Sequence, residues 1–212
     1  MRTYIYIDGF NFYYGAVKGT PFKWLNFKEL FKKLLAPHHK ILRIKYFTAI
    51  VSGKFDPDQP QRQKTFLRAL QTQIPEIEIF YGSFLTHEVV APLACTSTKF
   101  PYSFKVPVYK TEEKGSDVNL AVHLVNDAWE NQYDCAVVVS NDSDLAEALR
   151  IVKSRGKMVG LINPRDRTPA RELMKYADFN KKVRTEILKS SQFPDTIPGT
   201  TIRKPSNWYR RD

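Results

Sequence analysis

The chain alternates short apolar runs with segments in which apolar residues recur every three or four positions. Runs rich in β-branched and aromatic residues, which are typical of strands, cover residues 3–7, 41–51, 77–85, 136–139 and 158–162. Helical spacing covers residues 26–35, 61–73, 114–129, 143–155 and 169–175. Strands that alternate with helices predict an α/β fold with a central, mostly parallel sheet of about five strands flanked by helices.

Two stretches depart from this alternation. Prolines interrupt residues 86–113, which we interpret as an irregular insertion or a hairpin at the sheet edge. From Lys189 onward the chain is rich in Pro, Ser, Thr and Arg, which indicates a basic tail. We therefore expect one domain over residues 1–188 and a basic C-terminal tail over residues 189–212. The tail's basic and aromatic residues are typical of a nucleic-acid contact and equally of a disordered or docking terminus.

The same pattern predicts which side chains are buried. On the helix over residues 114–129 we expect one inward row, formed by Val118, Ala121, Val122, Val125 and Trp129. Four aromatic residues near the N-terminus have the chemistry to stack on bases: Tyr13, Tyr14, Trp24 and Phe27. At this density aromatic residues belong more often to the core, and we favour that assignment for all four.

Charge and composition narrow the class of protein. The 212 residues carry a net charge of +11, and such a surface attracts polyanions, nucleic acid first and an anionic membrane surface second. The apolar runs are far shorter than the ~20 residues of a membrane span. Asp8 interrupts the first apolar run, so we expect no signal peptide. The two cysteines have no zinc-ligand spacing, and a cytoplasmic location is the expectation.

Acidic residues recur where predicted strands end or helices begin. Asp8 ends the first strand, Asp117 opens a helix, and Asp142 and Asp144 follow the fourth strand. If the first and fourth strands are neighbours, these side chains meet at the carboxyl edge of the sheet. Clustered carboxylates without His or Cys suit Mg²⁺ or Mn²⁺, ions that activate water for displacement at phosphorus. In a basic protein this pattern indicates a metal-dependent nuclease.

The segment from Ser140 to Asp144 has a second interpretation. Ser, Asn and Asp are the preferred helix N-caps, and Asp144 with Glu147 has a spacing close to that of a capping box. Taken alone, the segment is equally compatible with capping and with an acidic site. Lys114 has a similar ambiguity, since it either meets a phosphate or is simply solvated.

Three separated motifs carry a family resemblance. They are Asp8-Gly-Phe-Asn11, Lys114-Gly-Ser-Asp117 and Ser140-Asn-Asp-Ser-Asp144. In order and context they resemble the NYN domain, a relative of the PIN-like nucleases, and specifically its LabA-like branch. The resemblance extends from about Thr3 to Asn163. It implies a three-layer, Rossmann-like PIN fold and RNA cleavage that depends on Mg²⁺ or Mn²⁺.

The resemblance also implies roles for individual residues. The catalytic and metal-binding set is Asp8, Asp117, Asp142 and Asp144. The substrate-binding set is Asn11, Lys114, Ser140 and Asn141. The sequence departs from the family at two positions: Asn141 stands where glycine is usual, and His123 stands where relatives often carry another acid. Asn tolerates a left-handed backbone, so we expect the turn to be kept; we expect His123 to be structural.

Two rival functions remain. A non-catalytic RNA-binding or regulatory module on the same fold is compatible with the pattern, although four acids argue against it. A phosphatase similar to the haloacid dehalogenases requires a second acid two positions after the first, where this chain has Phe10. The expected partner is RNA rather than a membrane, and a homodimer is left open.

Overall fold

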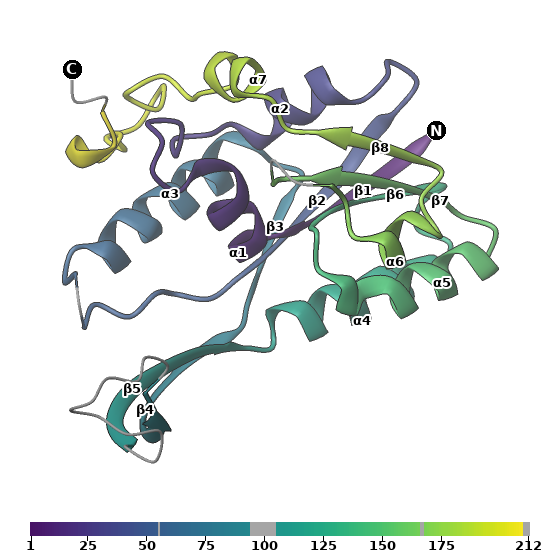
Figure 1. Ribbon diagram of the computed structural model, residues 1–212. Coiled ribbons are helices and arrows are strands. Elements are labelled where there is room, and N and C mark those ends of the chain that lie inside the picture. The colour runs from purple at the N-terminus through teal and green to yellow at the C-terminus, as the bar shows by residue number, and fades with distance from the viewer. Residues whose placement is uncertain (55, 94–104, 166–167, 210–212) are drawn as a thin grey trace.

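The computed structural model describes residues 1–212 except 55, 94–104, 166–167 and 210–212 (Figure 1). Its centre is a six-stranded sheet in the order β3-β2-β1-β6-β7-β8, in which every neighbouring pair is parallel. The strands are β1 (Arg2–Asp8), β2 (Lys40–Thr48), β3 (Ile77–Tyr81), β6 (Cys135–Val139), β7 (Met158–Asn163) and β8 (Phe179–Lys182). The α/β class and the parallel sheet are as predicted.

Helices cover both faces of the sheet and make three layers (Figure 1). One face packs against α2 (Phe27–Leu34), α3 (Gln59–Gln73) and α7 (Thr185–Ser190). The other packs against α4 (Ser116–Trp129), α5 (Ala146–Ser154) and α6 (Arg171–Met174). Alternation along β1 divides its side chains between two cores, with Ile5 and Ile7 in the first and Tyr4 and Tyr6 in the second. All of β6 is buried, as expected for a strand covered on both faces.

Shorter elements connect these layers. A brief α1 (Gly9–Phe12) and a π-helical turn, η1 (Tyr13–Val17), follow β1. The 3-10 turn η2 (Ser143–Leu145) precedes α5, and a second 3-10 turn, η3 (Ser206–Trp208), lies near the C-terminus. In the described parts of the chain, none of the helices combines the length and the apolarity needed to cross a membrane.

The predicted sheet lacked one strand. Phe179–Lys182 forms β8, which pairs with β7 at the sheet edge and makes the number six rather than about five. Its sequence, Phe-Asn-Lys-Lys, is mostly polar and exposed, because an edge strand is held by backbone pairing and needs little apolar surface. No hydrophobic pattern marks such a strand.

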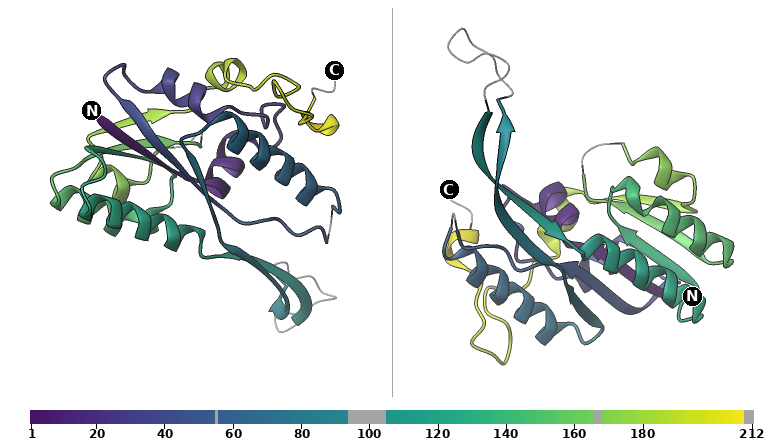
Figure 2. Two further views of the ribbon diagram at one scale, coloured as in Figure 1. Left: turned by 180° about the vertical axis from the view of Figure 1, so that it is seen from behind. Right: turned by 90° about the horizontal axis from the view of Figure 1, so that it is seen from below.

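The insertion after β3 is a regular hairpin. β4 (Ser83–Pro92) and β5 (Lys105–Lys114) pair antiparallel as a separate two-stranded sheet, which projects from the domain (Figure 2). Of the two expectations for this segment, the hairpin is confirmed and the irregular insertion is wrong, although the hairpin forms a sheet of its own and does not extend the edge of the main sheet. Its central part lies outside the described residues. The predicted strand over residues 77–85 divides at Gly82, where the chain leaves the main sheet.

The inward face of α4 differs from the prediction. Val118, Val122 and Trp129 are 65%, 60% and 66% exposed, whereas Leu120 and Leu124 are fully buried. The helix carries two apolar rows. The row that faces the sheet includes Asp127, and the presence of this acidic residue made the other row appear to be the buried one. That carboxylate is buried because Lys45 Nζ and the Tyr6 hydroxyl donate to it at 2.7 and 2.5 Å.

The basic tail is part of the fold. Phe193, Ile197 and Ile202 are buried in the same core as α2 and α3. The Trp24 indole N–H donates a hydrogen bond to the carbonyl oxygen of Pro194 at 2.8 Å. The described residues after Ser190 therefore cover one face of the core. A composition rich in Pro and Ser hid this, because the apolar anchors are isolated and follow no helical or strand period.

Candidate active site at the carboxyl edge of the sheet

The site is built around Asp8, the last residue of β1. Its side chain is buried, with 3% of its surface exposed, and it caps α1. Oδ1 accepts a hydrogen bond from the backbone N–H of Asn11 at 2.8 Å, and Oδ2 accepts one from the Ser140 hydroxyl at 2.9 Å. Ser140 directly follows β6, which pairs with β1, so the chain reverses its order across the sheet at this point. The first and fourth predicted strands, β1 and β6, are therefore neighbours, as the expected grouping of the acids requires.

The loop from Ser140 to Asp144 is held by its own polar groups. The Ser140 hydroxyl also accepts from the Asp142 N–H at 3.1 Å, and Asp142 Oδ1 accepts from the Asp144 N–H at 3.0 Å. Asp142 thus caps η2, so a capping role is correct for this residue. The expected capping box is not formed, because α5 begins after Leu145 without a side-chain cap and Glu147 pairs with Arg150. Capping uses only one of the Asp142 oxygens, and the other stays available to the site.

Asn141 joins two neighbouring segments to this loop. Its N–H donates to Asn11 Oδ1 at 3.2 Å, and its own Oδ1 accepts from the Ala170 N–H at 2.7 Å. Among the described non-glycine residues only Asn131 has a positive φ, so Asn141 needs no left-handed backbone. The turn is kept without glycine, and the amide ties the loop to the residue preceding α6.

The acids lie close enough for their charges to act on one another. Partial burial, followed by the charges of Asp8, Asp142, Glu113 and Asp144 in that order, raises the pKa of Asp117 to about 6. Burial likewise raises the pKa of Asp8, against the hydrogen bonds from Asn11 and Ser140. Asp117 reaches this edge because α4 runs back across the sheet and begins where the strands end.

Glu113 is a member of the acidic group that the sequence reasoning missed. It comes from β5, and its Oε1 accepts a hydrogen bond from the Ser116 N–H at 3.0 Å at the start of α4. The end of β5 can lie this close to residue 82 because that residue is glycine: a Cβ on Gly82 would lie 2.6 Å from the Lys114 carbonyl oxygen. The one indication in the sequence was that Glu113 lies four positions before Asp117, but it falls in the segment that we interpreted as irregular.

Two other predicted residues lie apart from the acids. Lys114 is exposed on the hairpin, and its Nζ lies 3.2 Å from Glu112 Oε2. His123 packs among aromatic rings, with 4.1 Å between its ring centroid and that of Phe80. Burial, followed by the charge of Lys45, lowers its pKa. His123 is therefore structural, as expected.

The acidic group has the donor chemistry of a site for a hard divalent cation, because all its ionisable groups are carboxylates. As placed, however, no three His, Cys, Asp or Glu side chains in the described ranges converge closely enough to share one ion. Both Asp8 oxygens are occupied by hydrogen bonds. The chemistry fits Mg²⁺ or Mn²⁺, and a shared site requires the more exposed carboxylates to turn toward Asp8.

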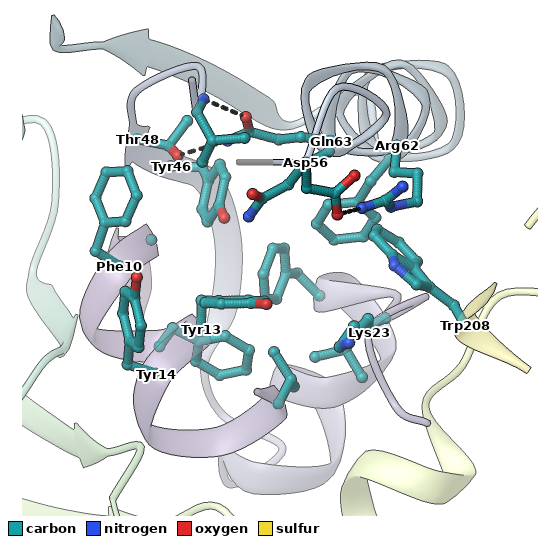
Figure 3. A pocket seen from close by; sticks show the side chains of 18 of the residues that line it. Phe10, Tyr13, Tyr14, Lys23, Tyr46, Thr48, Asp56, Arg62, Gln63 and Trp208 are labelled. Atoms are coloured by element: carbon teal, nitrogen blue, oxygen red, sulfur yellow. Dashed lines mark hydrogen bonds and ion pairs between the residues drawn. The ribbon is translucent and has the colours of Figure 1, made fainter. Parts of the chain in front are cut away.

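A cavity of about 360 Å³ is lined in part by Gly9 and Phe10, the two residues that follow Asp8 in the chain (Figure 3). Of the four aromatic residues predicted as core, Trp24 and Phe27 are buried in the hydrophobic core, and Phe27 also lines the cavity. Tyr13 and Tyr14 line the cavity without being fully buried, and Tyr14 is 58% exposed. No sequence pattern indicates this cavity, because its walls come from segments far apart in the chain.

The sequence matches the family model of the NYN domain over residues 2–181. The chain belongs to the NYN domain family. A relative from Pseudomonas putida, 6-hydroxy-3-succinoylpyridine 3-monooxygenase HspA, is 34% identical over an alignment of 239 positions, which covers 99% of this chain and 76% of the relative. NYN domains belong with the PIN-like nucleases, which typically use divalent metals, so the family and the relative's name point to different chemistry.

The fold is also found in a solved structure. A crystal structure of a protein of unknown function from Vibrio parahaemolyticus has a TM-score of 0.53 to this chain at 18% identity. The match covers 87% of this chain and 94% of the other. It supports the α/β architecture alone.

Proposed function

We propose that this NYN domain, in the LabA-like branch, is a ribonuclease that cleaves RNA phosphodiester bonds with Mg²⁺ or Mn²⁺. The observation that carries the proposal is the mutual effect of Asp8, Asp117 and Asp142 at the carboxyl edge of the sheet. Structural capping explains one carboxylate at a helix start; it does not explain several acids that raise one another's pKa. The net charge of +11 suits a polyanionic substrate, with the cytoplasm as the proposed location.

The residues take distinct roles in this proposal. Asp8, Asp117, Asp142 and Asp144 hold the ion, which supplies an activated water and stabilises charge at phosphorus when bound. Asp117, whose pKa is about 6, would bind a cation as its carboxylate, the form that predominates above about pH 6.

The remaining residues of the site orient its carboxylates. Ser140 and Asn11 hold Asp8 and the loop after β6, and Asn141 keeps that loop in place. We therefore assign these three residues to positioning rather than direct substrate binding. Lys114 remains the cation from the predicted substrate-binding set that is available to a phosphate.

Cleavage of a fluorescently labelled single-stranded RNA, with Mn²⁺, with Mg²⁺ and with chelator, tests the proposal. We expect Asp8→Asn and Asp142→Asn to lower the rate at least roughly a hundredfold. Asp134→Asn is the matched control, because Asp134 precedes the same strand β6 at the opposite end of the sheet and pairs with Arg2. Cleavage that survives chelation, or that both site variants retain, contradicts the proposal. Binding without cleavage under every condition identifies the non-catalytic RNA-binding module.

A second candidate is oxygenation of a small aromatic acid, favoured by the aromatic cavity and by the name of the Pseudomonas putida relative. The test measures loss of 6-hydroxy-3-succinoylpyridine in the presence of dioxygen and a two-electron donor. Turnover that Asp8→Asn leaves intact supports this candidate over the nuclease. Absence of turnover removes it.

A further inference from the structure

Aromatic side chains form much of the wall of the cavity that Gly9 and Phe10 line. Phe10 contacts Phe84 of the hairpin edge-on, with 5.3 Å between ring centroids. Trp208 packs against Trp24 and Phe66 at 6.3 and 6.1 Å, which fixes its indole near the cavity. Phe10, Phe84 and Trp208 are all partly buried, and these ring contacts form the walls without a ligand. Flat aromatic surfaces of this kind favour a planar ring as occupant.

Two cations face this cavity, and they differ in their partners (Figure 3). Arg62 forms an ion pair with Asp56, another lining residue, and its guanidinium lies against the Asn207 amide. Lys23 has no acidic or hydrogen-bonding partner among the residues that the structure describes. Partial burial lowers its pKa, and the neighbouring charge of Arg62 lowers it further.

An unpaired, partly buried ammonium beside an arginine is an unfavourable arrangement in the empty protein. A negatively charged group near Lys23 compensates for the hydration that the ammonium loses on burial, and it offsets the repulsion from Arg62. The cavity therefore has two complementary features, a slot with aromatic walls and one uncompensated positive charge at its margin. Its volume of about 360 Å³ is that of a site for a small molecule or a single nucleotide.

We propose that this cavity binds a planar aromatic ring that bears an anionic group, with the ring against Phe10, Tyr13 and Trp208 and the anion at Lys23. Two sources supply this chemistry: a nucleotide of an RNA chain and a free aromatic acid. A nucleotide in the cavity would lie near Asp8, since Gly9 and Phe10, the next two residues of the chain, line it. In that case the inference rests on the proposed ribonuclease and names a subsite for one base and its phosphate.

Calorimetric titration of the full chain tests this inference with paired probes. One pair is adenosine 5′-monophosphate and adenosine, and the other is 6-hydroxy-3-succinoylpyridine and its methyl ester. In each pair the ring is kept and the negative charge is removed. We expect at least one anionic probe to bind roughly tenfold more tightly than its neutral partner, the usual size of a charge-assisted contact. The pair that binds identifies the source.

Matched variants locate the site. Lys23→Met is expected to bring the anionic and neutral probes to equal affinity, whereas Lys64→Met, an exposed lysine on α3 outside the cavity, leaves the preference unchanged. Trp208→Ala is expected to weaken both members of the pair, and Trp129→Ala, exposed on α4, to weaken neither.

Three results overturn the inference: no binding of any probe, equal binding within both pairs, or an anion preference that Lys23→Met retains. Thermal melts of the variants identify any that fails to fold, and Lys23→Gln then replaces Lys23→Met. Because the titrations need no cleavage, the ribonuclease proposal is judged separately by the Asp8→Asn and Asp142→Asn variants.

Discussion

The Ser140 hydroxyl donates a hydrogen bond to Asp8 Oδ2 over 2.9 Å and connects the ends of the two neighbouring strands β1 and β6. Both residues are buried, and the same hydroxyl accepts from the Asp142 N–H. This one oxygen therefore holds a carboxylate of the first motif and a backbone amide of the third. The candidate site depends on it for the relative placement of two acids.

Replacing Ser140 with alanine removes both hydrogen bonds and leaves a buried carboxylate short of a donor. We expect Ser140→Ala to lower the free energy of unfolding at neutral pH by about 1–2 kcal/mol and to raise the pKa of Asp8 further. Chemical denaturation measures the loss. Ser154→Ala is the control, because that exposed hydroxyl bonds only the Ile151 carbonyl oxygen. Equal stability of the two variants would show that the Ser140 bond contributes little.

Asp117 makes stability depend on pH. Its folded pKa of about 6 lies above the ~3.9 of an unfolded aspartate, so ionisation costs the folded state more than the unfolded one. This cost is absent below about pH 4 and complete above about pH 6. We expect Asp117→Asn to stabilise the protein by roughly 1 kcal/mol at neutral pH, a figure reduced for partial exposure.

The gain from Asp117→Asn should vanish as the pH falls to about 4, where both states bind the proton. Denaturation curves across this range, with the wild type alongside, give the difference directly. A gain that is the same at both ends of the range would contradict the electrostatic explanation and point to a packing effect.

Glu113 and Glu112 are neighbours on β5 with different surroundings. Glu113 acts on the pKa values of Asp8 and Asp117, while Glu112 pairs with Lys110 and Lys114. We expect Glu113→Gln to lower the pKa of Asp117 and, if the ribonuclease proposal holds, to reduce cleavage about tenfold, as supporting residues of metal sites do. Glu112→Gln should change neither. Carbon-detected NMR titration of the aspartate carboxyls and the cleavage assay measure the two effects, and identical behaviour of the variants would remove Glu113 from the site.

Divalent ions should stabilise the native state by binding to the acidic site. At a Mn²⁺ concentration about a hundredfold above its dissociation constant, the stabilisation is about 2.7 kcal/mol. Asp142→Asn keeps an oxygen that can accept from the Asp144 N–H, so its stability without metal should stay close to that of the wild type. The Mn²⁺-dependent rise in melting temperature should be largely lost in Asp142→Asn and kept in Asp134→Asn. A full rise in the Asp142 variant would leave this carboxylate as a cap alone.

The segment after Ser190 should behave as core. Ile197 is fully buried, and we expect Ile197→Ala to cost about 2–4 kcal/mol. Val118→Ala on α4 removes an aliphatic side chain that is 65% exposed and should cost less than about 0.5 kcal/mol. Urea denaturation compares the two. A small loss for Ile197→Ala would return the segment to a peripheral tail, and a large one for Val118→Ala would restore the predicted inward face of α4.

The sequence by itself determined the α/β class, the strands β1, β2, β6 and β7, and the grouping of Asp8, Asp117 and Asp142. Each of these follows from local information. Runs of apolar residues specify buried strands, and the carboxyl ends of parallel strands lie at one edge of the sheet, so acids placed there share that edge.

The tertiary structure alone decided the rest. β8 exists because backbone pairing with β7 compensates for its polar side chains, and the inward face of α4 is set by Lys45, which makes burial of Asp127 favourable. The cavity brings Lys23 and Trp208 together from opposite ends of the chain. Such features depend on contacts between segments distant in sequence, whereas periodicity reports only on neighbours within a few residues of one another.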